Sequence, residues 1–476
     1  MRKSTPSETE FKSTAAQIGE TPDKNTENQV KINNKAMRRI DHSLARMYKG
    51  IEPIKFSKEA KDSRDAITRV IQLSGHRILE FTEAGFSEFK DIVKNIHSMQ
   101  ILGQDASYSD IWRATKSVIE SLLSEDQRPD DGSELVQLVR KKIAPDVIKR
   151  SFAISVYGIH LEANQPVKLG DFTLIPPTME SLRAVGLPVD IEHLPNSKDN
   201  LVSRSIANLG QDPLIVGQVT GTSEVAEARF RSRAELLMGL LAVFVGANYE
   251  NGATGFRFGI RYSSETALGK ATYFSWTEHS EEATVHMVFA SGQLLKLNDF
   301  KEKLFDQGLF ERGIRAIETE SRNELEEAMV KALYWFWDAQ RDVVPVMQFV
   351  KYWSCVETFF STKESVVRSV STGLATVLVA GGGDFFRPDE YVSLKRRITK
   401  LYAMRCRALH GASYQHVTSR DVADMSQWTA WMLLIMTSLL QRDYSSPDSV
   451  KFQTERLDAI LMRGVAAQHP TSDEAS

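Results

Sequence analysis

The chain has 476 residues, which is long enough for two or three domains that each bury a core of their own. Its formal net charge of -3 at pH 7 excludes a strongly basic protein, so any contact with nucleic acid must come from a local patch or from substrate entering a site. The two cysteines, Cys355 and Cys406, are too few for a disulfide framework and indicate a reducing compartment.

The N-terminal part of the chain divides into a polar tail and a helical region. Residues 1–35 are rich in Ser, Thr, Glu, Lys and Asn and contain little that could be buried, so we expect this tail to be disordered. In residues 36–145, apolar residues recur at spacings of three and four, which is typical of amphipathic helices. This pattern runs through residues 67–99 and again through 110–123, with a polar break at 126–134.

A change of pattern near residue 146 predicts a central α+β module over residues 146–318. Short β-branched and aromatic runs, such as FAISVYGIHLE and PLIVGQVTG, are separated there by Gly, Asn, Asp and Pro. The apolar run at 232–247 predicts at least one helix inserted between the strands.

The chain returns to a helical pattern over residues 319–446. Ser321 and Glu324 have the spacing of a capping box and predict a helix start, and a second helix is expected after Pro345. Residues 447–476 are expected to be a partly disordered extension. The whole sequence therefore predicts a mostly helical α+β multidomain protein with a central mixed module and a C-terminal helical bundle.

Two C-terminal helices each carry one charged residue within an otherwise apolar stripe. In the helix after Pro345 the stripe consists of Val346, Val350, Trp353, Glu357 and Phe360. In the helix before Gly411 it consists of Leu394, Ile398, Leu401, Arg405 and Ala408. Because a buried charge without a partner is strongly unfavourable, we infer that Glu357 and Arg405 meet. Taken alone, such a pair is better explained as an ion pair that fixes helix register.

His410 follows Arg405 near the end of the same helix. Five residues apart, the two side chains lie about 140° apart around an ideal helix. Gly411 is typical of the residue that ends a helix in left-handed conformation, and such an ending would let His410 turn toward Arg405. The helix dipole favours a protonated imidazole there, which suits an acid or base. A simple capping role for His410 is the alternative.

The segments YWSCVETFF (352–360) and ITKLYAMRCRALHG (398–411) resemble the HEPN superfamily, and within it the Apea-like HEPN domains of prokaryotic defence proteins. The resemblance covers roughly residues 321–445. It implies a HEPN bundle of four to five helices over residues 319–446. It also implies that Arg405, His410 and Glu357 are catalytic, with Glu357 as the acidic residue of an earlier helix.

The resemblance implies a metal-independent endoribonuclease that needs no cofactor. Its RNA substrate would be cleaved through attack of a 2′-OH on the adjacent phosphodiester, which is chemistry that Arg and His can support. A homodimer through the C-terminal helical domain, anti-phage defence by cleavage of tRNA or other cellular RNA, and a phage-derived trigger are also implied. The central module would then sense or regulate.

Position 406 departs from the family pattern, because active members frequently have Asn or Asp directly after the Arg and this chain has Cys406. This favours an alternative, in which the domain is a catalytically inactive scaffold for dimerisation or RNA binding.

Three other patterns are better explained without a functional role. The basic run RFRSR (229–233) could contact phosphates, but a solvated strand end or helix start explains it better. His279 and His286 do not have the spacing of a zinc site, so no metal is assigned. The GGGD run (381–384) lacks the Lys-Ser/Thr of a P-loop and is expected to connect two helices.

Two apolar runs, at 236–246 and 431–440, are the longest in the chain. Both are shorter than the roughly 20 residues that a membrane-spanning helix needs, and no secretion signal precedes them. We therefore expect a cytoplasmic protein without membrane contact.

Overall fold

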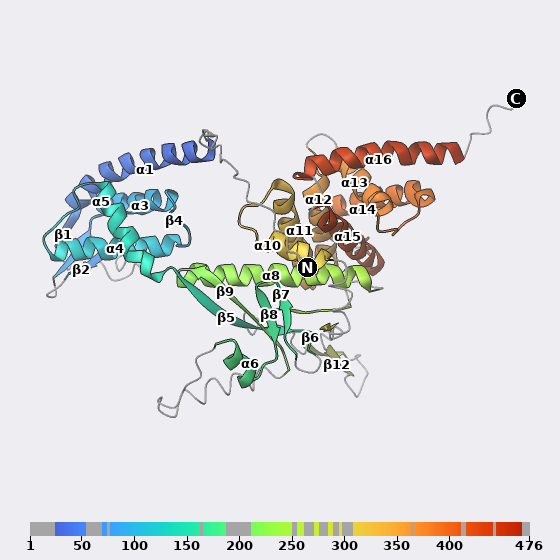
Figure 1. The fold of residues 1–476 in the computed structure, drawn as a ribbon, viewed down its shortest axis with the longest axis horizontal. Helices are drawn as coiled ribbons and strands as arrows, with labels where there is room; N and C mark the ends of the chain where they lie inside the picture. Colours follow the sequence, from blue (N-terminus) through green and yellow to red (C-terminus); the bar gives the residue numbers. More distant parts are fainter. Residues whose placement is uncertain are drawn as a thin grey trace, which may run out of the picture. The chain divides into compact units, whose positions relative to one another are not determined.

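Figure 1 shows the computed structural model of the chain, which forms two compact units. The first unit comprises Met1–Ile148 with Thr220–Ala226, and the second comprises Lys149–Val219 with Glu227–Ser476. Both are mostly helical with small sheets, so the α+β class is confirmed. The structure describes residues 24–53, 69–73, 77–161, 165–186, 211–249, 255–260, 271–275, 284–288, 295–297, 308–362, 366–410, 416–440 and 444–468.

The first unit packs helices against a small antiparallel sheet whose strand order is β1-β3-β2. Its elements are α1 (Lys24–Lys49), β1 (Ile51–Pro53), β2 (Val70–Gln72), β3 (Ile78–Phe81), α3 (Glu83–Ser98), β4 (Ile101–Gln104), α4 (Tyr108–Ser124), α5 (Gly132–Ile143) and a short 3-10 turn, η2 (Ala144–Asp146). The apolar stripe of α1 is fully or almost fully buried at Ile40, Leu44 and Met47. It belongs to one hydrophobic core with the stripe of α3, which explains why both helices form.

Two features of this region differ from expectation. Helix α1 begins at Lys24, before residue 36, where the helical region was expected to start, and it continues into the stripe that begins at the buried Ala36. Residues 1–23 lie outside the described residues. Val70–Gln72 and Ile78–Phe81 form β2 and β3 rather than helix, and α3 starts only after Thr82, whose hydroxyl accepts a hydrogen bond from Gly85 N at 3.1 Å.

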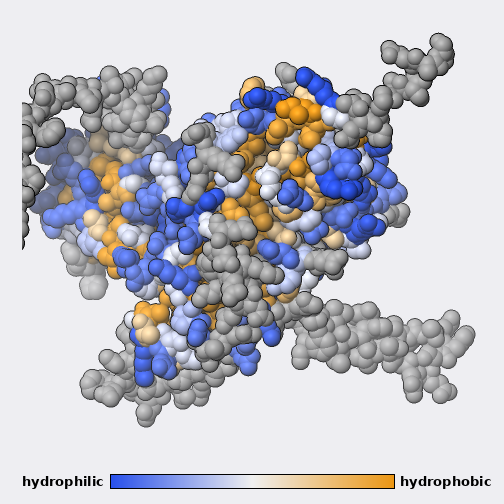
Figure 2. Space-filling view, turned by 45° about the vertical axis from the view of Figure 1, so that its right-hand side comes forward, coloured by the Kyte–Doolittle hydropathy of each residue, from blue (hydrophilic) through white to orange (hydrophobic). Residues whose placement is uncertain are grey.

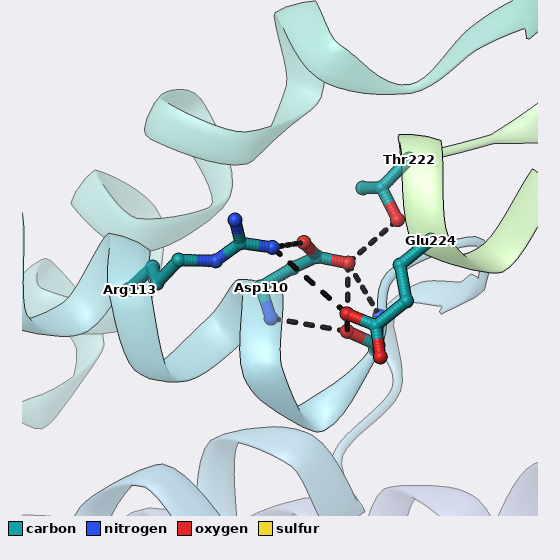
Figure 3. A network of polar contacts seen from close by, with 5 residues as sticks. Asp110, Arg113, Thr222 and Glu224 are labelled. Atoms are coloured by element: carbon teal, nitrogen blue, oxygen red, sulfur yellow. Dashed lines mark hydrogen bonds and ion pairs between the residues drawn. The ribbon is translucent and has the colours of Figure 1, made fainter.

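A polar cluster joins the start of α4 to residues 222–224, which belong to the same unit (Figure 3). The Asp110 carboxylate accepts hydrogen bonds from Ser107 N at 3.0 Å and from Thr222 Oγ1 at 2.6 Å, and it pairs with Arg113 at 2.6 Å. Burial alone would raise the pKa of Asp110, but the hydrogen bonds from Thr222 and Ser107 and the charge of Arg113 outweigh it and lower that pKa. The cluster thus caps the start of α4 and holds residues 222–224 against it.

In the second unit, a five-stranded sheet has the order β10-β5-β9-β8-β7, and β11-β12 and β13-β6 form two separate two-stranded sheets. The strands are β5 (Ile148–Tyr157), β6 (Ile159–His160), β7 (Val167–Leu169), β8 (Phe172–Ile175), β9 (Leu214–Gly221), β10 (Gly259–Ile260), β11 (Ala271–Ser275), β12 (Thr284–Val288) and β13 (Leu295–Lys296). A short helix, α6 (Met179–Ala184), follows β8. The expected sheet with an inserted helix is confirmed.

That inserted helix, α8 (Ser223–Asn248), packs its second-unit part on the sheet. The Phe230 ring lies 5.2 Å from the rings of both Phe152 and Phe172, centroid to centroid. Its other side reaches the C-terminal helices, where Trp431 Nε1 donates to Ala247 O at 3.0 Å. The RFRSR run lies inside this helix. Phe230 is buried, whereas Arg231 pairs with Glu227 on the solvent-facing side of the helix.

The C-terminal helices pack around α12. They are α10 (Leu309–Glu318), α11 (Glu324–Arg341), α12 (Pro345–Phe360), α13 (Val366–Ala380), α14 (Tyr391–His410), α15 (Ser419–Leu439) and α16 (Pro447–Gln468), with a short 3-10 turn, η6 (Pro388–Glu390), before α14. Helix α12 contacts α11, α13, α14, α15 and α16. The helix start at Pro345 is confirmed, and the GGGD run lies between α13 and η6, as expected of a connection.

The predicted capping box at Ser321 and Glu324 is wrong by two residues. The box is formed by Asn323 and Glu326. Arg322 explains the shift, because its guanidinium donates to the carbonyls of Ala316 and Ile317 at the end of α10 and so holds the preceding residues outside α11.

The extension after residue 446 was expected to be partly disordered. Its residues 447–468 form α16, which docks on the bundle through Asp458. Asp458 accepts a hydrogen bond from Tyr391 and pairs with Lys395 Nζ at 2.6 Å. Residues 469–476 lie outside the described residues.

Gly373 allows close packing at the centre of this bundle. A Cβ atom added there would lie 2.3 Å from Cδ1 of the buried Phe360. We therefore expect Gly373→Ala to lower the free energy of unfolding by about 1–3 kcal/mol, because overpacking forces side chains off their rotamers. Gly464→Ala in α16 is the matched control, since nothing lies within 4 Å of its added Cβ. Urea unfolding should show a lower midpoint for Gly373→Ala and an unchanged or higher one for Gly464→Ala.

Among the described residues, no helix is both long enough and apolar enough to cross a bilayer.

Candidate functional site

The two charges that interrupt the apolar stripes lie on neighbouring helices. Glu357 is in the last turn of α12, and Arg405 is in the last two turns of α14. The stripes that surround them are buried, as at Trp353 and Leu401, which have no exposed surface. This packing aims both charged side chains at the contact between the helices.

Glu357 and Arg405 form an ion pair, which confirms that the two charges meet. Arg405 Nη2 donates to Glu357 Oε2 at 2.8 Å. The side chains of Arg405 and Glu357 are only 16% and 19% exposed, so the pair is shielded from most solvent but still reachable from it. Removing one partner from a pair with this little exposure costs more free energy than breaking a surface ion pair, because it leaves a mostly buried charge unpaired.

Tyr402 is the third member of the cluster, and the sequence analysis did not identify it. Its hydroxyl donates to the second carboxylate oxygen, Glu357 Oε1, at 2.6 Å. The Arg405 guanidinium carbon lies 5.6 Å from the centre of the Tyr402 ring. Because Tyr402 lies three residues before Arg405, the same helical face carries both, which is the signal that could have found it.

The protonation of Tyr402 is fixed by its surroundings. Burial raises the pKa of its phenol, and the hydrogen bond to Glu357 and the charge of that carboxylate raise it further. The ring also packs edge-on against Trp353, with 5.1 Å between centroids. The phenol is therefore a donor throughout the physiological pH range, and both oxygens of Glu357 are occupied.

Arg405 keeps unused hydrogen-bonding capacity. Its Nε is buried and has no partner among the described residues. A guanidinium has five N–H donors in a planar fork, and the contact with Glu357 engages one nitrogen. The orientation of the side chain is thus fixed by one bond through Nη2, and the buried Nε is an unused donor inside the cluster.

His410 is the last residue of α14, so the helix is intact from Arg405 to this position. Five residues along an ideal helix correspond to a rise of about 7.5 Å. The His410 side chain and Gly411, which was expected to unwind the helix end, lie outside the described residues. The catalytic role of His410 therefore stays a prediction.

The two cysteines are free thiols in different environments. Cys355 is fully buried and donates weakly to Ala332 O at 3.3 Å, and burial raises the pKa of its thiol. Cys406 is partly exposed, directly beside Arg405. Cys355 is therefore a core residue, whereas Cys406 is part of the candidate site.

A basic groove of about 620 Å³ lies between α14 and the start of α15, and we call it the α14–α15 groove. It was not predicted. Arg397 in this groove pairs with Asp421 at 2.5 Å and Asp424 at 3.4 Å. Within the described part of the chain, three further cations of the groove form no ion pair: Lys400, Arg407 and Arg420. The groove thus carries excess positive charge on the same helix as Arg405.

The described residues contain no group of three His, Cys, Asp or Glu side chains placed to hold a metal ion. His279 lies outside the described residues, and so does the side chain of His286, which is in β12.

Comparisons with known proteins found no family model, no curated protein and no solved structure that matches this chain. The residues of α12 and α14 themselves are therefore the basis for assigning a function. Glu357, Tyr402 and Arg405 bring a carboxylate, a phenol and a guanidinium together, and this cluster is the candidate functional site.

Proposed function

We propose that the chain is a metal-independent endoribonuclease of the HEPN type, acting in the cytoplasm of a prokaryote as an anti-phage effector. The observation that carries this proposal is the pairing of Glu357 with Arg405, which leaves donors of Arg405 unused. The α14–α15 groove supports RNA as the substrate, because its unpaired cations suit a phosphodiester backbone.

In the proposed reaction, the 2′-oxygen of one nucleotide attacks its own phosphorus. A P–O2′ bond forms, the P–O5′ bond breaks, and the products end in a 2′,3′-cyclic phosphate and a 5′-OH. The extra negative charge of the phosphorane is stabilised by the planar guanidinium of Arg405. His410 moves a proton, either from the 2′-OH or to the departing 5′-oxygen.

Glu357 and Tyr402 act through Arg405 rather than on the RNA. Tyr402 donates to one oxygen of Glu357, and the other oxygen accepts from Arg405 Nη2. The carboxylate therefore cannot turn without breaking a short hydrogen bond, and this keeps the guanidinium in place before substrate arrives. Both are positioning residues.

A single histidine does not readily serve as base and acid in one step, so we propose a homodimer through the C-terminal bundle that brings two copies of Arg405 and His410 together. Exposed apolar side chains on the bundle support this, among them Phe452, Ile460 and Met462 of α16. Figure 2 displays hydrophobic surface on the helical side of the second unit, next to hydrophilic side chains. Surfaces of this kind are commonly buried in protein contacts.

The test is the chemistry of the RNA ends. Purified protein is incubated with cellular RNA in EDTA, and the cleaved ends are sequenced beside those from a His410→Ala control. We expect 2′,3′-cyclic phosphate and 5′-OH ends with the wild type only. The same ends at the same frequency with both proteins, or 5′-phosphate ends, would contradict the proposal.

A catalytically inactive scaffold for dimerisation or RNA binding is the second candidate. Two observations favour it: Arg405 is mostly buried in its ion pair, and Cys406 follows it where a polar residue is frequent in the resembling family. A wild-type protein that dimerises and binds RNA without cutting it, and an Arg405→Ala variant that behaves identically, would favour the scaffold.

A further inference from the structure

The first unit carries a second basic groove, unrelated to the candidate site. It lies between α1 and α3 and has a volume of about 940 Å³, and we call it the α1–α3 groove. Lys35, Arg38, Arg39 and His42 line it from α1, and Lys94 lines it from α3. Nothing in the sequence analysis assigned a role to these residues.

The four residues from α1 form one continuous stripe. Their spacings of three and four place them within about 100° of arc on an α-helix. From Lys35 to His42 the stripe rises about 10 Å along the helix axis. Lys94 faces this stripe from the neighbouring helix, so positive charge lines both walls of the groove.

Little negative charge offsets these cations. Within the described residues, Lys35, Arg38, Arg39 and Lys94 form no ion pair, and Asp91 is the one carboxylate that lines the groove. The carboxylates nearby are engaged elsewhere. Glu88 pairs with Arg46 at 3.3 Å, and Asp41 accepts a hydrogen bond from Gly132 N at 2.7 Å.

The chemistry of the groove favours one class of partner. The apolar face of α1 is buried in its own core at Ile40 and Met47, so the described side chains of this helix, from residue 34 onward, offer no free apolar face to a lipid surface. Among the described residues, no Phe, Tyr or Trp side chain lines the groove, so it offers no large aromatic platform for stacking bases or for anchoring an apolar peptide. What remains is a dense row of cations flanked by amide donors, which matches a polymer with evenly spaced phosphates.

We propose that the α1–α3 groove binds the phosphodiester backbone of a nucleic acid duplex through charge, without recognition of sequence. This site is independent of the proposed ribonuclease, because it lies in the first unit and needs no 2′-OH. DNA and RNA duplexes both present a phosphodiester backbone, and the experiment below shows which of the two duplexes binds.

The test measures binding of the full chain to labelled DNA and RNA duplexes of one sequence, at about 50 to 200 mM salt. We expect Arg38→Glu/Arg39→Glu to weaken binding at least about tenfold and to reduce the slope of log affinity against log salt by about 1.8 for DNA. Lys94→Glu, on the facing helix, should weaken binding independently. Arg38→Lys/Arg39→Lys should retain it, because the charge is kept.

The matched control is Lys141→Glu/Lys142→Glu, which reverses two adjacent exposed cations on α5 outside the groove. This variant should bind as the wild type does. Binding of only one duplex would identify its source as DNA or RNA. The proposal fails if the wild type binds neither duplex at about 50 mM salt, if Arg38→Glu/Arg39→Glu binds like the wild type, or if polyglutamate or anionic vesicles bind more tightly than both duplexes.

Discussion

Replacing Arg405 with alanine is expected to lower the rate of RNA cleavage by about 10³-fold or more, because a guanidinium that stabilises a phosphoryl transition state contributes about that much. Alanine also leaves Glu357 without its partner. Arg405→Lys separates the two effects, since a lysine keeps a charge for Glu357 but loses the planar fork. We expect about a 10²-fold lower rate for Arg405→Lys with little change in stability.

Single-turnover cleavage of a defined RNA, at saturating protein, gives these rates directly, and thermal unfolding reports the fold. Arg396→Ala is the control, because Arg396 is an exposed residue of the same helix that lies outside both the cluster and the α14–α15 groove. Equal rates for the wild type, Arg405→Ala and Arg405→Lys would remove Arg405 from the reaction.

Replacing Glu357 with alanine is expected to lower the free energy of unfolding by about 3 kcal/mol, since it leaves a mostly buried guanidinium unpaired. Tyr402 would lose its acceptor at the same time. Glu357→Gln should cost less, because an amide oxygen can still accept from Tyr402. The double variant Glu357→Leu/Arg405→Leu should recover much of the loss, since it leaves neither charge buried alone.

Urea unfolding followed by tryptophan fluorescence measures these differences, and the wild type, Glu357→Leu, Arg405→Leu and the double variant form a double-mutant cycle. If Glu357→Leu and Arg405→Leu each lower stability by little and their effects simply add, the pair has no energetic role. Glu357 would then be a surface carboxylate that happens to lie near Arg405.

Part of the candidate site could be predicted from the sequence because of a simple physical conflict. Glu357 and Arg405 stand where apolar residues belong, and burying both is tolerable only if they pair, which the structure confirms. Tyr402 was missed because an aromatic residue on a buried face creates no such conflict. Its function in the cluster depends on the direction of one hydroxyl, which residue spacing does not encode.

The fold was predicted well where a signal was unambiguous and poorly where two signals overlapped. At Pro345 the sequence offers no second position for the helix start, and the helix begins there. Near α11, both Ser321-x-x-Glu324 and Asn323-x-x-Glu326 fit a capping box, and the contacts of Arg322 with the end of α10 decide between them. Residues 70–81 contain short apolar runs, and periodicity alone cannot tell whether such runs form strands or helices.

The hydrogen bond from Thr222 to Asp110 has a consequence for how the N-terminal part of the protein is made. Thr220–Ala226 complete the first unit, although more than 70 residues of the second unit precede them in the chain. A fragment that stops near residue 145, as the sequence pattern suggests, would leave the Asp110 carboxylate without this donor. During synthesis on the ribosome, the first unit therefore stays incomplete until the first strands of the five-stranded sheet have been synthesised.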